Sequence, residues 1–86
     1  PEGTNIHTAL YFYFQTCSIQ VKAKKIAKIM ASIANGGVCP FTSKKIFSPT
    51  TNRNCLSMMY SCGMYEFSGE YAFSVGLPAK SGVSGA

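Results

Sequence analysis

The stretch GMYEFSGEYAFSVGLPAKSGV, residues 63–83, brings together a tyrosine between glycines, a short aromatic segment and a Lys-Ser-Gly triplet. Gly63 predicts the end of one helix at positive φ, and Ser68 predicts the cap of the turn that follows. The glycine and proline of residues 76–78 predict the end of that turn before an extended segment. Tyr65 is therefore expected in a hinge between two helices. Because a plain packing segment rarely combines these features, we interpret the stretch as part of a binding site.

The composition is that of one small folded domain. The chain has 86 residues, of which 47% are hydrophobic and 13% aromatic, and these values exclude a disordered segment. A chain of this size buries only roughly 60–65% of its unfolded surface, so its own core is marginal and further protein is expected around it. No run approaches the roughly 18 apolar residues of a membrane span, and no signal-peptide pattern is present. The first residue is Pro1, and we expect the chain to be part of a longer protein.

Positive charge is concentrated in one segment. The net charge of +5 comes from eight Lys/Arg against three Asp/Glu, and half of these cations are the lysines of residues 22–28. A lysine run beside an apolar stripe is typical of the solvated face of an amphipathic helix. A nucleic-acid or acidic surface is the alternative partner for such a face.

The cysteines do not indicate a metal site or a disulfide framework. They lack Cys-x-x-Cys spacing and lie far from His7, the one histidine: Cys17, Cys39, Cys55 and Cys62. We therefore expect buried, reduced thiols, as in a cytosolic or organelle-matrix protein.

The first helix is expected over residues 6–17, where apolar residues recur at helical spacing. Thr4 or Asn5 is the expected N-cap. Tyr13 belongs to the apolar stripe, and by periodicity alone it is either a core residue or a ligand contact.

Two further helices have clear boundary signals. The second is expected over residues 22–34, with lysines opposite an apolar face, and the Asn-Gly-Gly of residues 35–37 ends it because these residues tolerate the left-handed conformation. The third is expected over residues 49–62. Ser48 is its predicted N-cap and Pro49 its first residue, where the missing N–H costs nothing.

Only one segment is predicted as a strand. Residues 38–47 are expected to form a connecting loop, whereas residues 77–86 are extended. A single strand cannot satisfy its backbone groups on both sides, so a partner sheet must come from outside this stretch.

Three motifs carry a resemblance to a known family. GMYEFSG at residues 63–69 and GLPAKSGV at residues 76–83 resemble the serine-dependent glutaminases. YFYFQTCSI at residues 11–19 is similar to the family's Asp-Phe-Tyr-Phe-Gln-x-Cys-Ser-Ile motif, with Tyr11 in place of the acid. The family's catalytic domain looks like that of the β-lactamases and penicillin-binding proteins, in which a strand carrying Lys-Ser/Thr-Gly faces a Ser-x-x-Lys nucleophile.

The resemblance implies the fold class and the extent of the domain. It implies an α+β fold like that of the β-lactamases, mostly helical here, with one C-terminal strand of the central antiparallel sheet. It also implies that residues 1–86 are a partial glutaminase catalytic domain, incomplete at both ends.

The resemblance further implies hydrolysis of L-glutamine to L-glutamate and ammonia through a serine acyl-enzyme, without cofactor or metal. Residues 1–86 contain no Ser-x-x-Lys motif in a suitable context, so we expect them to be inactive alone. The implied partners are L-glutamine and, in the full-length protein, further copies in a dimer or tetramer; no nucleic-acid or membrane partner is expected. Animal members of the family are mitochondrial and bacterial members cytoplasmic.

Roles for individual residues also follow from the resemblance. Tyr65 takes the place of the tyrosine beside the serine, as a catalytic proton carrier and a substrate contact. Tyr13 takes the place of a substrate-contacting tyrosine. Val83 matches the substrate-binding position whose backbone N–H donates into the oxyanion hole. The supporting residues of the same strand are Lys80, Ser81 and Gly82.

Each interpretation has a plainer alternative. Tyr65 can be a hinge anchor, and Lys80 and Ser81 can face solvent on an edge strand. A penicillin-recognising, β-lactamase-like serine hydrolase is the second function class, and a basic helical binding module is the third. The tyrosine motifs resemble glutaminases rather than β-lactamases, which favours the first class.

Overall fold

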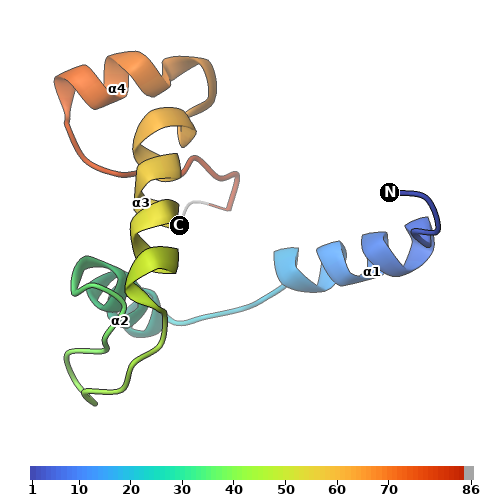
Figure 1. The fold of residues 1–86 in the computed structure, drawn as a ribbon, viewed down its shortest axis with the longest axis horizontal. Coiled ribbons are helices and arrows are strands. Elements are labelled where there is room, and N and C mark those ends of the chain that lie inside the picture. The colour runs from blue at the N-terminus through green and yellow to red at the C-terminus, as the bar shows by residue number, and fades with distance from the viewer. Residues whose placement is uncertain (85–86) are drawn as a thin grey trace.

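The computed structural model describes residues 1–84, and over this range the chain is mostly helical. The helices are α1 (Ile6–Cys17), α2 (Ala23–Ala34), α3 (Pro49–Cys62), the short 3-10 helix η1 (Tyr65–Phe67) and α4 (Ser68–Ser74). In Figure 1, α3 runs through the middle of the main body, α2 lies at one end of it and α4 at the other. Helix α1 stands apart, joined to α2 by an extended segment.

The helix starts follow from local side-chain chemistry. The Asn5 side chain accepts hydrogen bonds from the backbone N–H groups of His7 and Thr8, at 3.0 and 3.3 Å. The Ser48 hydroxyl accepts from the N–H of Thr51 at 3.1 Å, and a proline follows it as the first residue of α3. Both predicted N-caps are therefore confirmed, because a side-chain oxygen satisfies N–H groups that the first turn leaves free.

The end of α2 is fixed by backbone geometry and by one buried side chain. Gly36 and Gly37 both have positive φ, 70° and 93°, as predicted for the helix end. The Asn52 side-chain amide, buried in α3, donates to the carbonyl of Ile33 at 2.9 Å and so satisfies one of the last carbonyls of α2. This contact joins the start of α3 to the end of α2.

The loop between α2 and α3 folds back on itself. Val38 and Lys45 form an isolated antiparallel bridge. The N–H of Ile46 donates to the carbonyl of Gly37 at 2.8 Å, and a Cβ on this glycine would come within 2.7 Å of the Phe47 carbonyl. Glycine is therefore required at position 37 for close approach as well as for its φ.

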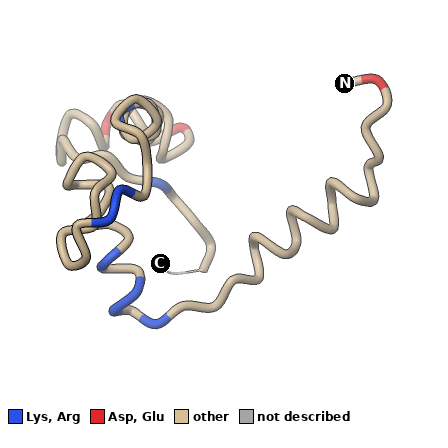
Figure 2. The backbone as a smooth tube through the Cα atoms, turned by 60° about the horizontal axis from the view of Figure 1, so that its bottom comes forward, with Lys and Arg blue, Asp and Glu red and all other residues tan. Residues whose placement is uncertain are grey.

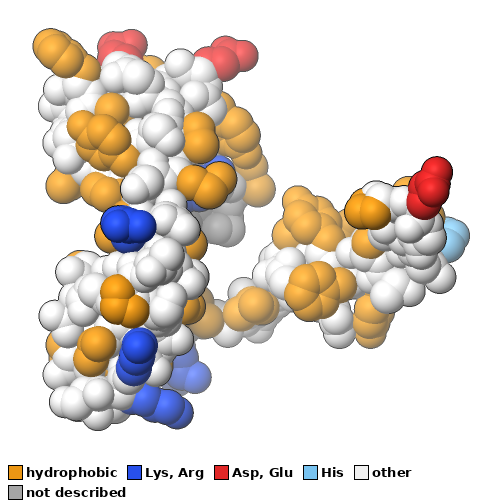
Figure 3. Space-filling model, in the orientation of Figure 1, with side chains coloured by type: hydrophobic (Ala, Val, Ile, Leu, Met, Phe, Trp, Pro, Cys, Tyr) orange, Lys and Arg blue, Asp and Glu red, His pale blue; other side chains and the backbone are white. Residues whose placement is uncertain are grey.

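Little apolar surface is buried by residues 1–84. Cys39 is the only apolar side chain in this range that is less than a tenth exposed. Figure 3 shows apolar side chains on the surface of both the main body and α1. On α1 these include Ile6, Leu10 and Phe14, which are all more than 40% exposed.

Most of the cysteines are not buried, contrary to the expectation. All four are free, and only Cys39 is buried, whereas Cys17, Cys55 and Cys62 are exposed. The prediction of burial was wrong for these three because it assumed that each apolar helical stripe finds a partner, and within residues 1–84 these stripes largely lack one.

The lysine face of α2 is exposed to solvent, as the periodicity predicted. Lys22, Lys24, Lys25 and Lys28 are all exposed. Figure 2 shows these lysines at one end of the main body, whereas the acidic residues lie elsewhere along the tube. Within residues 1–84, no helix has the length and apolar character needed to cross a membrane.

The strand predicted over residues 77–86 is not formed in the part that the structure describes. Residues 77–84 are irregular, and residues 85–86 lie outside the described range. The physical reason is that a strand needs a pairing partner, and no other strand is present within residues 1–84. The helical content is confirmed, and the structure does not show the β-lactamase-like sheet.

Candidate active site

The segment after α4 is held against the end of α3 at Gly63. The N–H of Ser81 donates to the Gly63 carbonyl at 2.8 Å, and Gly63 is buried. A Cβ at this position would overlap the carbonyl of Ala79. Gly63 ends α3 as its C-cap, as predicted, but the predicted positive φ was wrong, since its φ is −72°. The glycine is required because another backbone segment passes directly against it.

The positive φ falls on Tyr65 instead. Its φ is 51°, and within residues 1–84 the only other non-glycine residue with positive φ is Ser43. A side chain other than glycine in this region costs of order 1–3 kcal/mol, and such residues cluster at functional sites. The side chain of Tyr65 is 73% exposed, so the strain is not offset by burial of the ring. This conformation turns the chain sharply between α3 and α4, as a hinge does.

Ser68 makes hydrogen bonds on both sides of this turn. Its hydroxyl donates to the Tyr65 carbonyl at 2.7 Å and accepts from the N–H of Met64 at 3.0 Å. The prediction that Ser68 caps the next turn was wrong. Ser68 is the first residue of α4, and its side chain hydrogen-bonds to residues that precede it in the chain. Ser68 is 7% exposed, so the residue that hydrogen-bonds to the hinge is buried.

Tyr65 and Lys80, two residues of the predicted site, are brought together across this junction. The Lys80 Nζ lies 4.6 Å from the centroid of the Tyr65 ring and donates to the Ser81 carbonyl at 2.6 Å. An ammonium over a phenol ring is attracted to the negative face of the ring. The cation is thereby held beside the one exposed tyrosine that has a strained backbone.

Tyr13 lies on α1, which stands apart from the main body (Figure 1). A hydrogen bond with the Cys17 thiol raises the pKa of Tyr13, followed by the charge of the same thiol, by desolvation and by the charge of Tyr65. The Tyr13 side chain is 60% exposed, so within residues 1–84 it is not a core residue.

The remaining predicted residues follow Lys80 along the chain. Ser81 is half-buried and anchors the segment through its backbone N–H. Gly82 and Val83 are exposed, and the side chain of Val83 points fully into solvent. The backbone is irregular at these positions, and the oxyanion role of Val83 stays a prediction.

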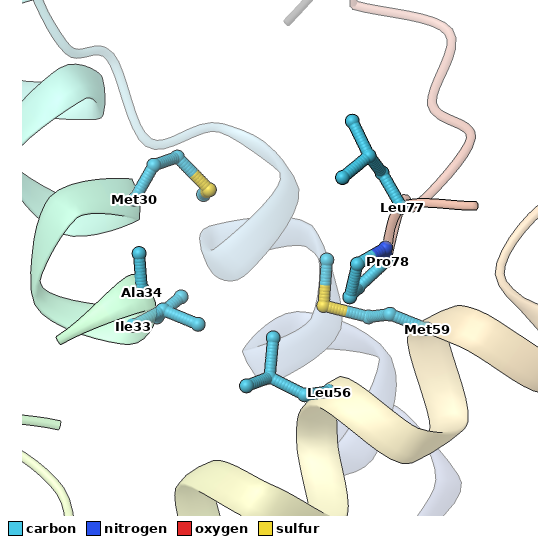
Figure 4. Close-up of a pocket in the computed structure, with 7 residues that line it drawn as sticks. All are labelled: Met30, Ile33, Ala34, Leu56, Met59, Leu77 and Pro78. Carbon is cyan, nitrogen blue, oxygen red and sulfur yellow. The ribbon is translucent and has the colours of Figure 1, made fainter. Parts of the chain in front are cut away.

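An apolar groove lies beside the junction, and sequence patterns did not reveal it as one feature. In Figure 4 its side chains come from α2, α3 and the start of the segment after α4, and they point toward one another: Met30, Ile33, Ala34, Leu56, Met59, Leu77 and Pro78. Its volume is about 350 Å³. A neighbouring hollow of about 340 Å³ shares Met30 and Met59 and reaches Lys80. Helical spacing identified the stripes of α2 and α3, but only the fold shows that they face each other.

One thiol outside this site has a lowered pKa. Hydrogen bonding by the Thr42 hydroxyl and then by the N–H of Phe41 lowers the pKa of the Cys39 thiol to about 7. This thiol sits in the loop between α2 and α3. Within residues 1–84, no group of three or more His, Cys, Asp or Glu side chains is placed to hold a metal ion.

Comparison with known proteins identifies relatives over nearly the whole chain. The sequence model of the family described as Glutaminase matches residues 3–86. The mitochondrial liver isoform of glutaminase from Rattus norvegicus is 52% identical over all of this chain, which covers 14% of that protein. Putative glutaminase 2 of Caenorhabditis elegans is 53% identical over 99% of the chain, again 14% of that protein. A glutaminase of Nostoc sp. is 47% identical over 94% of the chain, which covers 24% of that protein.

Proposed function

The chain belongs to the glutaminase family, and from this membership we propose that it forms part of a catalytic domain that hydrolyses L-glutamine to L-glutamate and ammonia. The observation that carries the proposal is the family match over residues 3–86, and the junction at Gly63, where Tyr65 and Lys80 meet, supports it. The family match supports a glutaminase rather than a penicillin-recognising enzyme, since the similar proteins carry the name glutaminase.

In the proposed reaction, a serine hydroxyl attacks the side-chain amide carbon of glutamine. The C–N bond breaks as the leaving nitrogen takes up the proton of the serine hydroxyl and departs as ammonia, and water then hydrolyses the acyl-serine to release glutamate. Tyr65 passes the proton between the serine and the leaving nitrogen. Its exposed hydroxyl and its strained, fixed backbone support this role.

Binding of the substrate is assigned to two further positions. Tyr13 contacts the substrate, a role that the similarity of residues 11–19 to the family motif supports. The backbone N–H of Val83 donates to the oxyanion that forms on the amide oxygen. Lys80 keeps a positive charge next to the reacting groups, while Ser81 and Gly82 hold that segment close to the substrate.

The fold proposed for the whole catalytic domain is that of the β-lactamases. Residues 77–86 become a strand there because a neighbouring sheet supplies the hydrogen-bond partners that residues 1–84 do not provide. The extensive exposed apolar surface and the small share of each relative's length that the chain covers support a larger domain. Assembly into a homo-oligomer is part of the same proposal.

The proposal is tested by placing this chain in a full-length relative. We define the host chimera as the rat liver isoform in which the matched 86 residues are replaced by this chain. We expect the host chimera to release ammonia from L-glutamine at a rate within about tenfold of the unmodified isoform. A tenfold difference in rate corresponds to a change of only about 1.4 kcal/mol in the activation free energy. A chimera that melts at the temperature of the rat isoform but releases no ammonia would contradict the proposal.

The 86 residues by themselves are expected to be inactive. They contain no Ser-x-x-Lys motif, and an acyl-transfer reaction needs an activated nucleophile. Ammonia release by the purified chain, followed in a coupled assay, checks this expectation. Turnover of roughly 1–1000 per second, as in ordinary enzymes, would show that the nucleophile lies within these residues.

Val83→Ala in the host chimera is expected to change kcat by less than about threefold. The proposed donor is the backbone N–H, which alanine keeps, and the side chain that is removed is fully exposed. Steady-state kinetics with L-glutamine measure the effect. A loss of a hundredfold with unchanged Tm would assign the role to the side chain and not to the amide.

A further inference from the structure

We infer that Ser68 is a positioning residue, whose hydroxyl holds Tyr65 in the left-handed conformation that sets its phenol beside Lys80. The inference rests on the proposed role of Tyr65 in proton transfer, and it assigns a task to a residue that does not touch the reacting atoms. It would make the buried hydroxyl, and not the tyrosine alone, a determinant of the rate.

The hydrogen bonds of Ser68 enclose the strained residue. The hydroxyl accepts from the N–H of Met64, just before the hinge, and donates to the carbonyl of Tyr65, just after the positive φ. These two bonds hold the peptide group that precedes Met64 and the peptide group that follows Tyr65, so the restraint spans the strained residue. The acceptor and donor distances, 3.0 and 2.7 Å, are those of well-formed hydrogen bonds.

The residue type is as specific as the geometry. A hydroxyl can accept and donate at the same time, which neither a methyl group nor an acceptor-only group can do. Ser68 is 7% exposed, so water is not freely available to replace either bond. Loss of the hydroxyl leaves the Met64 N–H without its partner and removes the restraint on Tyr65.

The other side of the site is fixed independently, which gives the restraint its effect. Lys80 is held by the backbone bond from Ser81 to Gly63, on the α3 side of the hinge. With that segment fixed, relaxation of Tyr65 to negative φ would swing the phenol away from the Lys80 ammonium, which now lies 4.6 Å from the ring centroid. A displacement of about 1 Å can cost on the order of a hundredfold in rate.

The test compares two serine deletions in the host chimera. Ser68→Ala is expected to lower kcat by about 10- to 100-fold while KM for L-glutamine stays within about threefold, because the phenol is misplaced for proton transfer. Ser57→Ala is the matched control, since the Ser57 hydroxyl donates only to the carbonyl of Arg53 on the exposed side of α3. The control is expected to retain the kcat of the unmodified chimera. Full kcat in Ser68→Ala would overturn the inference.

A double variant separates positioning from plain stabilisation. If Ser68 acts through the tyrosine, Ser68→Ala should cost less than about twofold in kcat when Tyr65→Phe is already present, because coupled residues are not additive. A residue that merely stabilises the fold would cost the same in both backgrounds, and that result would overturn the inference. If Tyr65→Phe alone has no effect while the chimera is active, the proposed role of Tyr65 fails and the inference fails with it.

A second substitution covers the case in which Ser68→Ala does not fold. Ser68→Cys keeps a side chain of similar shape but offers only a weak donor and a weak acceptor. We expect it to fold and to lower kcat by at least about fivefold, between the unmodified chimera and the alanine variant. A cysteine variant with unchanged kcat would overturn the inference.

Discussion

Tyr65→Phe in the host chimera is expected to lower kcat by roughly 10²- to 10⁴-fold, the range for a lost general acid–base group, with little change in KM. Phenylalanine keeps the ring over which the Lys80 ammonium lies, 4.6 Å from its centroid, and removes only the hydroxyl. Because the ring is 73% exposed, the substitution removes no buried packing. The loss would therefore report proton transfer and not a change of fold.

Tyr60→Phe is the control for this prediction. Tyr60 lies on regular helix α3 and is also exposed, at 45%, but its backbone is not strained. Removal of the Tyr60 hydroxyl should leave kcat within about twofold of the unmodified chimera, as expected for a surface substitution. If Tyr65→Phe behaves like Tyr60→Phe, Tyr65 is a hinge anchor whose hydroxyl has no part in the reaction.

The helices could be predicted closely from sequence because their signals are local. The capping side chains of Asn5 and Ser48 lie within three residues of the N–H groups that they satisfy. Helix α2 ends at the predicted place, before Asn-Gly-Gly, because the two glycines adopt the left-handed conformation. Only the start of α2 differs, since Lys22 lies just before the helix and provides no side-chain cap.

The hinge was located correctly, but its chemistry was assigned to the wrong residues. Glycine is the usual residue for a positive φ, so Gly63 was predicted to carry it, whereas Tyr65 does. Serine after a turn usually caps the next helix, whereas Ser68 bonds backward. For Gly63 the cause is distant in sequence: the segment carrying Ala79 crosses the end of α3, and such a contact leaves no local signal.

The strand over residues 77–86 and the burial of the cysteines failed for a related reason. Both depend on partners that are not adjacent in sequence, a second strand in one case and an apolar surface in the other. The family resemblance assigned Tyr65 and Lys80 to the site separately, and their proximity is a finding of the structure. The role of Val83 stays a prediction, since it concerns a backbone donor in a segment that is irregular here.

Gly63→Ala is expected to damage the site more broadly than any side-chain deletion around it. The new Cβ would overlap the Ala79 carbonyl, which belongs to backbone and cannot rotate aside, so the 79–81 segment must move away from α3. Overpacking of this kind costs typically about 1–3 kcal/mol. The movement also breaks the bond from Ser81 to the Gly63 carbonyl and takes Lys80 from Tyr65, so we expect kcat/KM to fall by at least about 10²-fold.

Gly69→Ala provides the control, because a Cβ at that position of α4 meets nothing within 4 Å. Alanine is favoured over glycine inside a helix by roughly 0.5–1 kcal/mol, so this variant should keep its activity and melt at the same temperature or slightly higher. Both variants are measured in the host chimera by kcat/KM for L-glutamine and by Tm. If Gly63→Ala matches Gly69→Ala in both quantities, residues 79–81 do not pack on α3 in the working enzyme, and the junction cannot be what brings Lys80 to Tyr65.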